Sequence, residues 1–493
     1  MKSIQTITRR ISLINIVFVI KSLFYCSAQT VIYKDSVPDF LTDYSGNLTV
    51  AEVAPVIEFS FIRRDEGIVA TGYSHWGNVV LGPDSKFYYA IGNHISNGIV
   101  ILKSFNPKIN TDEICIFSSD VEGLNDGKWH GRPTINPSNG DMYLIGFYQG
   151  QVVKYNIFSK QVINFGQAGE QGWEEHIWDN NNNRLYGVGS QGKVLVFNTE
   201  TNEVITSQQP FEGIDTDRRA RMIDDETGTF YATCNSGEFY KYDPEANKFS
   251  KLNSTISSDL RAANTTKETD GSFWICSSDG NLYKFFPDKD RLDSKGLLAE
   301  TSGYYTFIER SPMGNYLYYM AASPDGNLIQ YNTNNGDKKV IACLSDFYNE
   351  KYKFTIGSCY GGALSKDGSS IFLVCNGRLE GLQVPAFFYV HIPQTERDME
   401  NFLDKFKISE LDLHAAPNPF YQATNILFTL AHSRSIILKI FTIEGKILYQ
   451  HQGFYQAGDN RIQWAPGSLP DGTYLYYFET GLSVKTGKLI VKK

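Results

Sequence analysis

Hydrophobic and polar residues alternate with a period of two over much of the chain, in short runs separated by turn residues. One unit, DMYLIGFYQGQVVKYN at Asp141–Asn156, has the pattern of a strand, a tight turn with glycine, and a second strand that ends in an aromatic residue. Similar units lie at Arg184–Asn198, Thr229–Asp243, Ser272–Phe286 and Asn315–Asn332. The closing aromatic residues, which are 42, 45, 43 and 46 residues apart, are Tyr155, Phe197, Tyr242, Phe285 and Tyr331. A repeat of this length made of short strands is typical of a β-propeller blade.

The same pattern predicts a seven-bladed β-propeller over residues 52–393. Its blades are expected at 72–118, 127–168, 172–210, 216–256, 259–300, 303–345 and 355–393. Each has four strands, of which the last is more polar, but blade seven lacks its fourth strand. Val56–Phe61 (VIEFSF) is predicted to supply that strand, which closes the ring and removes an exposed strand edge. Residues 29–50 carry few periodic signals and are interpreted as an extended leader.

The pattern changes after the last blade. Residues 394–410 are charged and are interpreted as a linker. Residues 411–493 contain about seven short alternating strands, which predict a small Ig-like β-sandwich. The fold class expected from the sequence is therefore all-β, a seven-bladed propeller followed by this sandwich.

The N-terminus indicates export. Lys2, Arg9 and Arg10 precede an apolar run at Ile11–Ile20, and Ser27-Ala28 provides a small-residue cleavage site, so residues 1–28 are interpreted as a signal peptide. No other run is long and apolar enough to predict a transmembrane segment. The formal net charge is −8 and no basic tract is present, so we expect no nucleic-acid partner.

Six cysteines remain after cleavage, and export permits disulfides. Cys359 and Cys375 are predicted on neighbouring strands of one blade and form the one pair worth testing, whereas most of the others are interpreted as small buried hydrophobic residues. No cysteine or histidine spacing indicates zinc, and the acidic turn with Asp288, Asp290 and Asp293 is interpreted as a solvated loop rather than a calcium site. We expect no metal and no cofactor.

The C-terminal segment resembles a known family. The motifs that carry the resemblance are Pro417-Asn418-Pro419, Ile440-Phe441, Glu444-Gly445-Lys446, Leu469-Pro470-Asp471-Gly472-Thr473-Tyr474 and the basic end KLIVKK. In this order they resemble the type A C-terminal sorting domain of the type IX secretion system of Bacteroidetes, with mild departures at Asp471 and Glu444. The resemblance implies export across the outer membrane by the type IX machinery. Its sortase-like peptidase would then remove the domain or exchange it for a lipid anchor at the cell surface. A carbohydrate-binding sandwich is the alternative.

Candidate site residues follow from the propeller geometry. The first strand of each blade begins, and the second ends, at one face, where their residues surround the axial funnel. Aligning the blades to within about one residue places Trp76, Tyr304 and Tyr360 there. The predicted ligand-binding residues at these positions are His130, Arg132, Tyr148, His176, Arg219, Arg261 and Tyr305. Two interpretations stay open: these side chains lock blade to blade, or they converge on a ligand. Arginine with aromatic rings suits an anionic sugar.

A catalytic version of the funnel hypothesis assigns His75 and His94 as the reacting pair. The two histidines flank a strand hairpin and are similar to the paired histidines of propeller polysaccharide lyases, in which histidine or tyrosine removes the proton next to a uronate carboxylate. The sequence thus leaves three functions open. The propeller binds an extracellular glycan, cleaves an acidic polysaccharide by β-elimination, or binds a protein without a small-molecule site.

Overall fold

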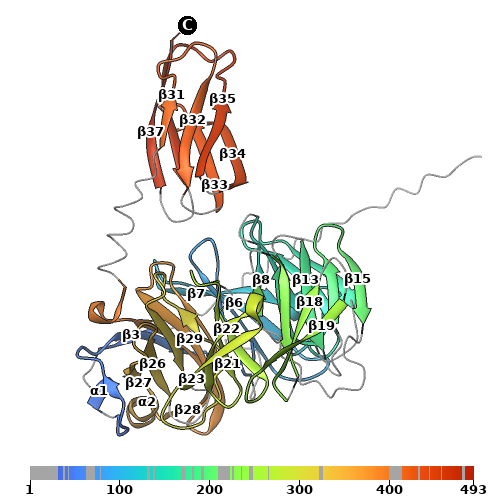
Figure 1. The fold of residues 1–493 in the computed structure, drawn as a ribbon, viewed down its shortest axis with the longest axis vertical. Coiled ribbons are helices and arrows are strands. Elements are labelled where there is room, and N and C mark those ends of the chain that lie inside the picture. Colours follow the sequence, from blue (N-terminus) through green and yellow to red (C-terminus); the bar gives the residue numbers. More distant parts are fainter. Residues whose placement is uncertain are drawn as a thin grey trace, which may run out of the picture.

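The repeats of the sequence form successive antiparallel sheets in the computed structural model. The structure describes residues 32–36, 39–42, 44–62, 73–77, 79–129, 134–136, 139–167, 173–179, 183–189, 194–208, 222–224, 227–234, 236–243, 248–264, 266–320, 326–398, 413–430, 434–443, 445–456, 458–479 and 484–492. Among these residues, no helix combines the length and hydropathy that crossing a membrane requires. Figure 1 shows the sheets of residues 33–391 together in one body and strands β31–β37 in a second.

Seven sheets make up the described part of residues 33–391, and we number them in chain order. Sheet 1 contains β4 (Val80–Leu81), β5 (Phe87–Gly92), β6 (Val100–Asn106) and β7 (Thr111–Phe117). Sheet 2 contains β8 (Thr134–Ile135), β9 (Asp141–Ile145), β10 (Gln151–Asn156) and β11 (Val162–Gln167). Sheet 3 contains β12 (Trp173–Asp179), β13 (Arg184–Gly189), β14 (Val194–Asn198) and β15 (Glu203–Gln208). Sheet 4 contains β16 (Met222–Asp224), β17 (Thr229–Thr233), β18 (Glu238–Asp243) and β19 (Lys248–Thr255).

The remaining three sheets follow the same order of strands. Sheet 5 contains β20 (Leu260–Ala263), β21 (Phe273–Ser277), β22 (Asn281–Phe286) and β23 (Arg291–Leu297). Sheet 6 contains β24 (Glu309–Arg310), β25 (Tyr316–Met320), β26 (Asn327–Asn332) and β27 (Lys338–Cys343). Sheet 7 contains β28 (Phe354–Leu364), β29 (Ser370–Leu379) and β30 (Leu382–His391), and helix α2 (Ser345–Tyr352) connects it to sheet 6.

Alternating side chains along each central strand pack against the two neighbouring sheets. In β25, for example, Leu317 and Tyr319 join a core with sheet 5, whereas Tyr318 and Met320 join a core with sheet 7. Such cores lie between every pair of successive sheets, and one further core places Phe87 of sheet 1 against Phe372 of sheet 7. Because the packing continues from the last sheet back to the first, the arrangement is that of a β-propeller.

The early strand β3 (Val56–Phe61) pairs antiparallel with β30 and becomes the fourth strand of sheet 7. This pairing confirms the prediction that VIEFSF completes the last blade. The strand is short and largely buried, and Phe59 has no exposed surface. The ring of Phe59 contacts Tyr348 at 4.8 Å, Tyr352 at 5.0 Å and Phe388 at 6.2 Å between centroids. Burial of this aromatic cluster fixes the pairing of two segments that are far apart in the sequence.

The segment before β3, which sequence analysis interpreted as a leader, is also folded onto the propeller in its described part. Strand β1 (Tyr33–Asp35) adds to β3, and β2 (Thr49–Val50) pairs in parallel with β27 of sheet 6. The one-turn helix α1 (Asp39–Thr42) between them buries Phe40 completely. Asp35 accepts hydrogen bonds from Lys351 Nζ at 2.6 Å and Tyr352 Oη at 2.8 Å. This N-terminal strap, residues 33–50, therefore covers the outer edges of sheets 6 and 7.

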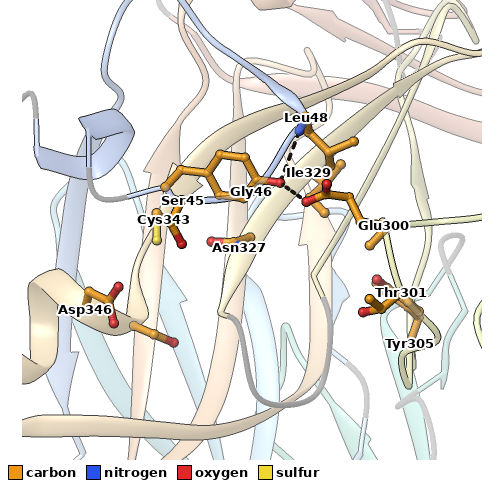
Figure 2. A pocket seen from close by; sticks show the side chains of 13 residues that line it. Ser45, Gly46, Leu48, Glu300, Thr301, Tyr305, Asn327, Ile329, Cys343 and Asp346 are labelled. Atoms are coloured by element: carbon orange, nitrogen blue, oxygen red, sulfur yellow. Dashed lines mark hydrogen bonds between the residues drawn. The ribbon is translucent and has the colours of Figure 1, made fainter.

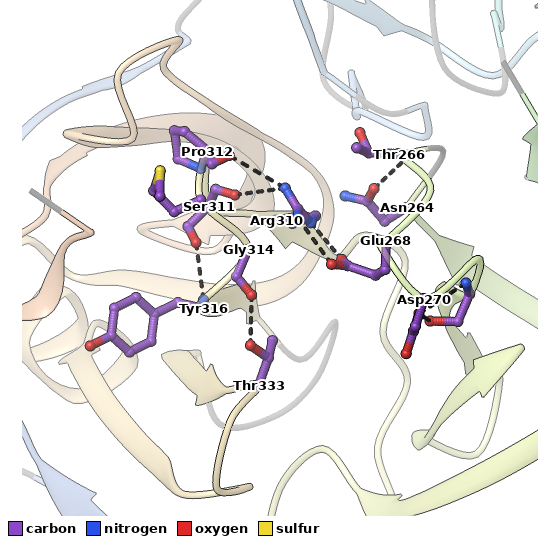
Figure 3. Close-up of polar contacts among 12 residues, drawn as sticks. Asn264, Thr266, Glu268, Asp270, Arg310, Ser311, Pro312, Gly314, Tyr316 and Thr333 are labelled. Atoms are coloured by element: carbon purple, nitrogen blue, oxygen red, sulfur yellow. Dashed lines mark hydrogen bonds and ion pairs between the residues drawn. The ribbon is translucent and has the colours of Figure 1, made fainter. Parts of the chain in front are cut away.

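Polar side chains also tie neighbouring sheets together. Between sheets 5 and 6, Arg310 donates from Nε to Glu268 Oε1 at 2.5 Å and from Nη2 to Glu268 Oε2 at 3.0 Å, as Figure 3 shows. The two side chains are only 14% and 13% exposed. A two-pronged contact of this kind holds the guanidinium and the carboxylate in one plane and fixes their orientation. The pair thus sets how the two sheets meet.

Residues 413–491 form two further sheets. The first contains β31 (Leu413–Ala416), β32 (Thr424–Leu430) and β35 (Gly458–Trp464). The second contains β34 (Ile447–Tyr455), β33 (Arg434–Phe441), β36 (Gly472–Glu479) and β37 (Val484–Val491). Apolar residues of both, such as Phe428 and Phe478 at 4.8 Å between rings, share one core. The seven strands and this shared core are those of a small sandwich, whose immunoglobulin-like connectivity stays a prediction.

The segment that follows the last propeller strand is held against sheet 6 as far as it is described. A short 3-10 turn at Gln394–Glu396 buries the side chain of Glu396, which pairs with Lys339 at 2.9 Å. Asp398 accepts a hydrogen bond from the backbone of Met313 at 2.8 Å. Residues 399–412, the remainder of the predicted linker, lie outside the described residues.

None of the six described cysteines is joined in a disulfide, and five of them are buried. Cys359 and Cys375 face each other in the register of β28 and β29, as the sequence predicted, but they are not joined by a disulfide. Their thiols sit in the core between sheets 6 and 7. They act here as small apolar residues.

Our first prediction concerns the closing strand. Replacing Phe59 by alanine should lower the free energy of unfolding by about 3–5 kcal/mol, because it removes a fully buried aromatic ring and leaves a cavity at the pairing of β3 with β30. Thermal and urea denaturation followed by circular dichroism would measure the loss. The control is Val53→Ala, a side chain that is 53% exposed in the same segment. Equal melting temperatures of the two variants would show that the ring does not depend on β3.

Candidate functional site

A row of aromatic and cationic side chains lies where the first strands of several sheets begin and the second strands end. We call this row the aromatic arc. It consists of Arg261, Tyr304, Tyr360, Trp76, His94, Lys128, Phe147 and Tyr148. These residues come from sheets 5, 6, 7, 1 and 2, so segments as far apart in the sequence as Trp76 and Tyr360 meet there. Seven of the eight side chains are half-buried, which leaves part of each ring or cation open to a ligand.

The centre of the arc is a stack of two rings from the first and last sheets. Trp76 and Tyr360 lie 4.9 Å apart with their planes at 23°. Trp76 Nε1 donates a hydrogen bond to Ser74 Oγ at 2.5 Å, which fixes the indole, and Ser74 itself bridges to Gly92 at the end of β5. Tyr304 meets Tyr360 edge to face at 6.4 Å. Offset and edge-to-face contacts are the favoured geometries of aromatic pairs, so the stack is a rigid surface.

Two cations of the arc lie against its rings, one beside Tyr304 and one beside Trp76. The guanidinium carbon of Arg261 is 3.8 Å from the centre of the Tyr304 ring. Lys128 Nζ is 5.0 Å from the centre of Trp76 and 3.8 Å from that of Phe147. Cation–π contacts of this length hold a positive charge against an aromatic face without neutralising it. The arc therefore offers both rings and positive charge to a ligand.

Asp126 positions the part of the arc that belongs to sheet 2. Its carboxylate accepts backbone hydrogen bonds from Tyr148 and Gln149, both at 2.8 Å, and from Lys128 at 3.0 Å. The side chain is fully buried, and burial raises the pKa of Asp126, while the three backbone donors lower it. The carboxylate thus fixes the backbone of the turn after β9 and does not occupy the side chains of Lys128 and Tyr148.

His94 takes part in the arc through its ring and its backbone. Its ring centre is 4.6 Å from that of Trp76, and its carbonyl accepts a hydrogen bond from Tyr148 Oη at 3.0 Å. Its backbone lies in the left-handed region with φ of 58°, and its N–H donates to Gly127 of the next sheet. Burial, followed by the nearby charge of Lys128, lowers the pKa of His94 to about 4. The ring is therefore neutral at physiological pH and is a weak base.

His75, the other half of the predicted catalytic pair, lies in the interior. Its ring is fully buried, Nδ1 contacts the Ala90 carbonyl at 2.8 Å, and burial lowers its pKa to about 4. Its backbone N–H and carbonyl exchange hydrogen bonds with the Asn376 side chain of sheet 7, at 2.7 and 2.8 Å. This residue thus has the geometry of a lock between two blades and does not reach the surface of the arc.

Arg261 is the most deeply placed cation of the arc. The residue is 6% exposed, and Nη1 is 3.6 Å from Asp259 Oδ2. In the described part of the chain, neither Nε nor Nη1 has a hydrogen-bond partner. Burying a guanidinium with hydrogen-bonding capacity unused is costly unless another acceptor arrives. Arg261 thus has donors left for an anionic group.

The other predicted site residues lie apart from the arc or outside the description. Tyr305 is 1% exposed and packs at 5.5 Å against Tyr319 in the core between sheets 5 and 6, so its neighbour Tyr304 takes the place expected for it. His176 lies in β12 opposite Gly187, and its side chain is outside the described part. The remaining candidates outside the described residues are His130, Arg132 and Arg219.

Sequence reasoning did not find Lys128 and Phe147. Lys128 precedes the aligned strand of blade two, and Phe147 directly precedes the predicted Tyr148 in the turn FYQG. The sequence feature that could have indicated Phe147 is the pair of adjacent aromatic residues, Phe147 and Tyr148. In an exposed turn, such a pair presents at least one ring to solvent. Lys128 carries no signal of its own.

The described residues contain no group of three histidine, cysteine, aspartate or glutamate side chains that could hold a metal ion. In the acidic turn after β22, Asp290 instead accepts hydrogen bonds from the backbones of Asn253 at 2.6 Å and Ser254 at 2.9 Å. Its carboxylate thereby joins β19 to the neighbouring sheet.

Comparison with known proteins identifies the C-terminal domain. Residues 415–492 match the family model described as a secretion system C-terminal sorting domain. The match covers the sandwich and confirms the resemblance to type IX sorting domains, and such a tail indicates export across the outer membrane. No curated protein matches the chain. Among solved structures, a chain of the structure described as "Crystal Structure of Mitotic Checkpoint Complex" is similar to this chain, with a TM-score of 0.47 and 9% sequence identity. The similar region covers 71% of this chain and 99% of that chain.

Our second prediction concerns the buried His75. The pKa of His75 is about 4 in the folded protein and about 6.5 for an ordinary histidine, so on acidification the unfolded state takes up the proton first. The stability from the neutral ring is fully present above about pH 6.5 and is lost as the pH falls toward about 4. Between these pH values, we expect the free energy of unfolding of His75→Asn to depend less on pH than that of the wild type. The difference in slope should be up to about 1.4 kcal/mol per pH unit.

Urea denaturation at several pH values between 7 and 5 would measure this slope. The matched control is His414→Asn in the C-terminal domain, which lies outside the propeller whose unfolding is followed and should therefore leave the slope unchanged. A slope that is identical in the wild type and in His75→Asn would contradict the buried neutral histidine.

Proposed function

We propose that the chain is an exported seven-bladed β-propeller that binds an acidic extracellular glycan on the aromatic arc. The observation that carries this proposal is the stack of Trp76 on Tyr360, with the cations Arg261 and Lys128 beside the two ends of the row. Aromatic faces pack against the C–H surface of pyranose rings, and arginine pairs with carboxylate or sulfate groups. The indole of Trp76, which is held by its hydrogen bond to Ser74 and by the Tyr360 ring, loses little entropy on binding.

The arc supports an extended ligand rather than a single sugar. It runs over five consecutive sheets in the order 5, 6, 7, 1 and 2. A polymer that crosses the mouth of the funnel can therefore stack on Tyr304, Tyr360 and Trp76 in turn while its charged groups meet the two cations. Charge-assisted contacts also raise the rate of encounter with an acidic polymer and make binding sensitive to salt.

The same geometry gives less support to the alternative function, a polysaccharide lyase that acts by β-elimination. A lyase needs a base in contact with the sugar, and the buried His75 does not reach the arc. His94 touches the arc, but a pKa of about 4 makes it a poor acceptor for the proton beside a carboxylate. Binding is thus the function that the arrangement favours, and the appearance of an unsaturated product with a uronate polymer is the finding that would replace it by catalysis.

For export, we propose that residues 411–493 direct the chain through the type IX machinery. Its sortase-like peptidase then removes the domain or replaces it by a surface lipid anchor. The match to sorting domains over residues 415–492 supports this route. The sandwich has its own core, and in the described part that core contains residues of β31–β37 and their connecting turns alone, so its removal leaves the seven sheets intact.

Our third prediction tests the glycan. Trp76→Ala should weaken binding of oligosaccharides from alginate, polygalacturonate or chondroitin sulfate about tenfold or more, because the central stacking surface is lost. Arg261→Gln should weaken the binding of these acidic oligosaccharides and leave a neutral oligosaccharide unaffected. Isothermal titration calorimetry would give the affinities, and melting temperatures would show that the variants stay folded.

The matched control is Phe158→Ala, an aromatic side chain that is 58% exposed in the turn at the opposite end of β10. It should leave the affinity unchanged. Failure of every acidic oligosaccharide to bind the wild type would reject the glycan and favour a protein partner. Lower melting temperature with unchanged affinity in Arg261→Gln would show that Arg261 is a lock between blades.

Our fourth prediction concerns export. A chain truncated after residue 410 should fold with an unchanged propeller melting transition but remain in the periplasm, since it lacks the sorting domain. Cell fractionation and protease treatment of whole cells would locate it. The control is Tyr421→Ala in the full chain, which alters an exposed side chain of the domain. Normal surface display of the truncated chain would contradict the assignment.

A further inference from the structure

A cavity beside sheet 6 is lined by residues that do not belong to the aromatic arc. Its volume is about 320 Å³. Its walls are the N-terminal strap at Tyr44–Leu48, the connection from sheet 5 to sheet 6 at Ala299–Tyr305, and the region where β26 and β27 meet the start of α2. Figure 2 shows side chains from these three segments surrounding one space. A cavity of this size is at the lower end of small-molecule sites and matches a monosaccharide.

The strap forms a fixed wall of this cavity. Tyr44 Oη donates to Glu300 Oε2 at 2.6 Å, and Asn47 donates to Glu300 Oε1 from its backbone and from its side chain, both at 2.8 Å. These donors, Tyr44 first, lower the pKa of Glu300, which is therefore ionised at neutral pH. Beyond the cavity, β2 continues the strap by pairing with β27. The wall is thus tied at both ends, and the cavity keeps its shape without a ligand.

Two polar atoms inside the cavity have unused hydrogen-bonding capacity. Asn327 at the start of β26 is 9% exposed, and its Oδ1 has no hydrogen-bond partner in the described part of the chain. Ser345 Oγ, at the start of α2, has none there either. Figure 2 shows the Asn327 side chain in the middle of the lining. Because buried polar groups are almost always paired, these two atoms indicate a molecule that donates hydrogen bonds to them.

The charge of the lining restricts what that molecule is. Glu300 and Asp346 bring carboxylates, and the described residues of the lining include no lysine, arginine or histidine. An anionic ligand would be repelled, whereas hydroxyl groups can donate to carboxylates, to Asn327 and to Ser345. Leu48, Ile329 and Tyr305 give the cavity an apolar side, as the C–H face of a sugar ring requires.

We propose that this cavity binds a neutral sugar of hexose size, held by Asn327, Ser345 and Asp346 against the wall formed by the strap. The proposal does not rest on the glycan-binding function of the aromatic arc, because the two sites share no residue and have opposite charge. A ligand of about twelve non-hydrogen atoms with ordinary ligand efficiency binds with a dissociation constant on the order of 1 mM.

Thermal denaturation of the full-length chain with D-glucose, D-galactose, D-mannose or N-acetyl-D-glucosamine tests the proposal. At about 50 mM, at least one of these sugars should raise the melting temperature of the propeller by about 2–5 °C. Asn327→Leu, which keeps the branched shape of the side chain and removes the amide, should abolish the shift. Asp346→Lys, at an exposed position of the lining, should weaken binding at least about tenfold, because it replaces the carboxylate by a long side chain that occupies part of the cavity.

Two controls separate this site from other effects. Glu350→Gln alters an exposed side chain of the same helix α2 outside the cavity, and Trp76→Ala alters the arc; both should keep the full shift. A sugar acting only as an excluded osmolyte would stabilise all variants equally. The proposal is overturned if none of the four sugars raises the melting temperature of the wild type. It is equally overturned if the shift persists in Asp346→Lys and in folded Asn327→Leu.

Discussion

The pairing of β3 with β30 is the interaction on which the rest of the structure depends. It joins residues about 330 positions apart, and closing so long a loop costs about 5 kcal/mol of chain entropy. Burying Ile57, Phe59 and Phe61 against sheet 7 and α2 contributes about 1.5–3 kcal/mol each, which offsets that cost. Once sheet 7 is complete, its other face packs on sheet 1 and brings Tyr360 onto Trp76. The centre of the aromatic arc therefore exists only in the closed ring.

Closure also explains why the histidines at the funnel differ in role. At the junction of sheets 7 and 1, Asn376 binds the backbone of His75, and the imidazole is enclosed because the two sheets meet around it. One residue further, Trp76 points out of the junction and stacks on Tyr360. His94 lies at the next turn, where the backbone N–H reaches sheet 2 while the ring stays at the surface. Adjacent residues thus divide into buried locks between sheets and half-buried side chains of the aromatic arc.

The sequence predicts the strands well, but it does not predict which of two adjacent residues is a lock and which belongs to the arc. The aromatic repeat and its turns predicted the strands from β9 to β26, and the isolated run VIEFSF predicted the closing strand, because both signals are local and periodic. Site residues were aligned to within about one position, and neighbouring residues of an extended chain point in opposite directions. A shift of one position therefore exchanged Tyr305 for Tyr304. The strap had no periodic signal, since its three elements are short and are held by contacts with sheets 6 and 7.

The N-terminal strap both covers the outer strand edges of sheets 6 and 7 and forms one wall of the cavity. Outer strands of a propeller expose unpaired backbone groups, which invite pairing with other chains. In sheets 6 and 7 the strap covers these edges, and Glu396 adds a second contact to β27 through Lys339. A segment that crosses from one sheet to the next cannot fill the space beneath it completely, and the unfilled space here is lined by Glu300 and Asn327. The arc near the axis gathers cations and rings, whereas the cavity at the edge gathers carboxylates. The two places on one propeller therefore carry charge of opposite sign.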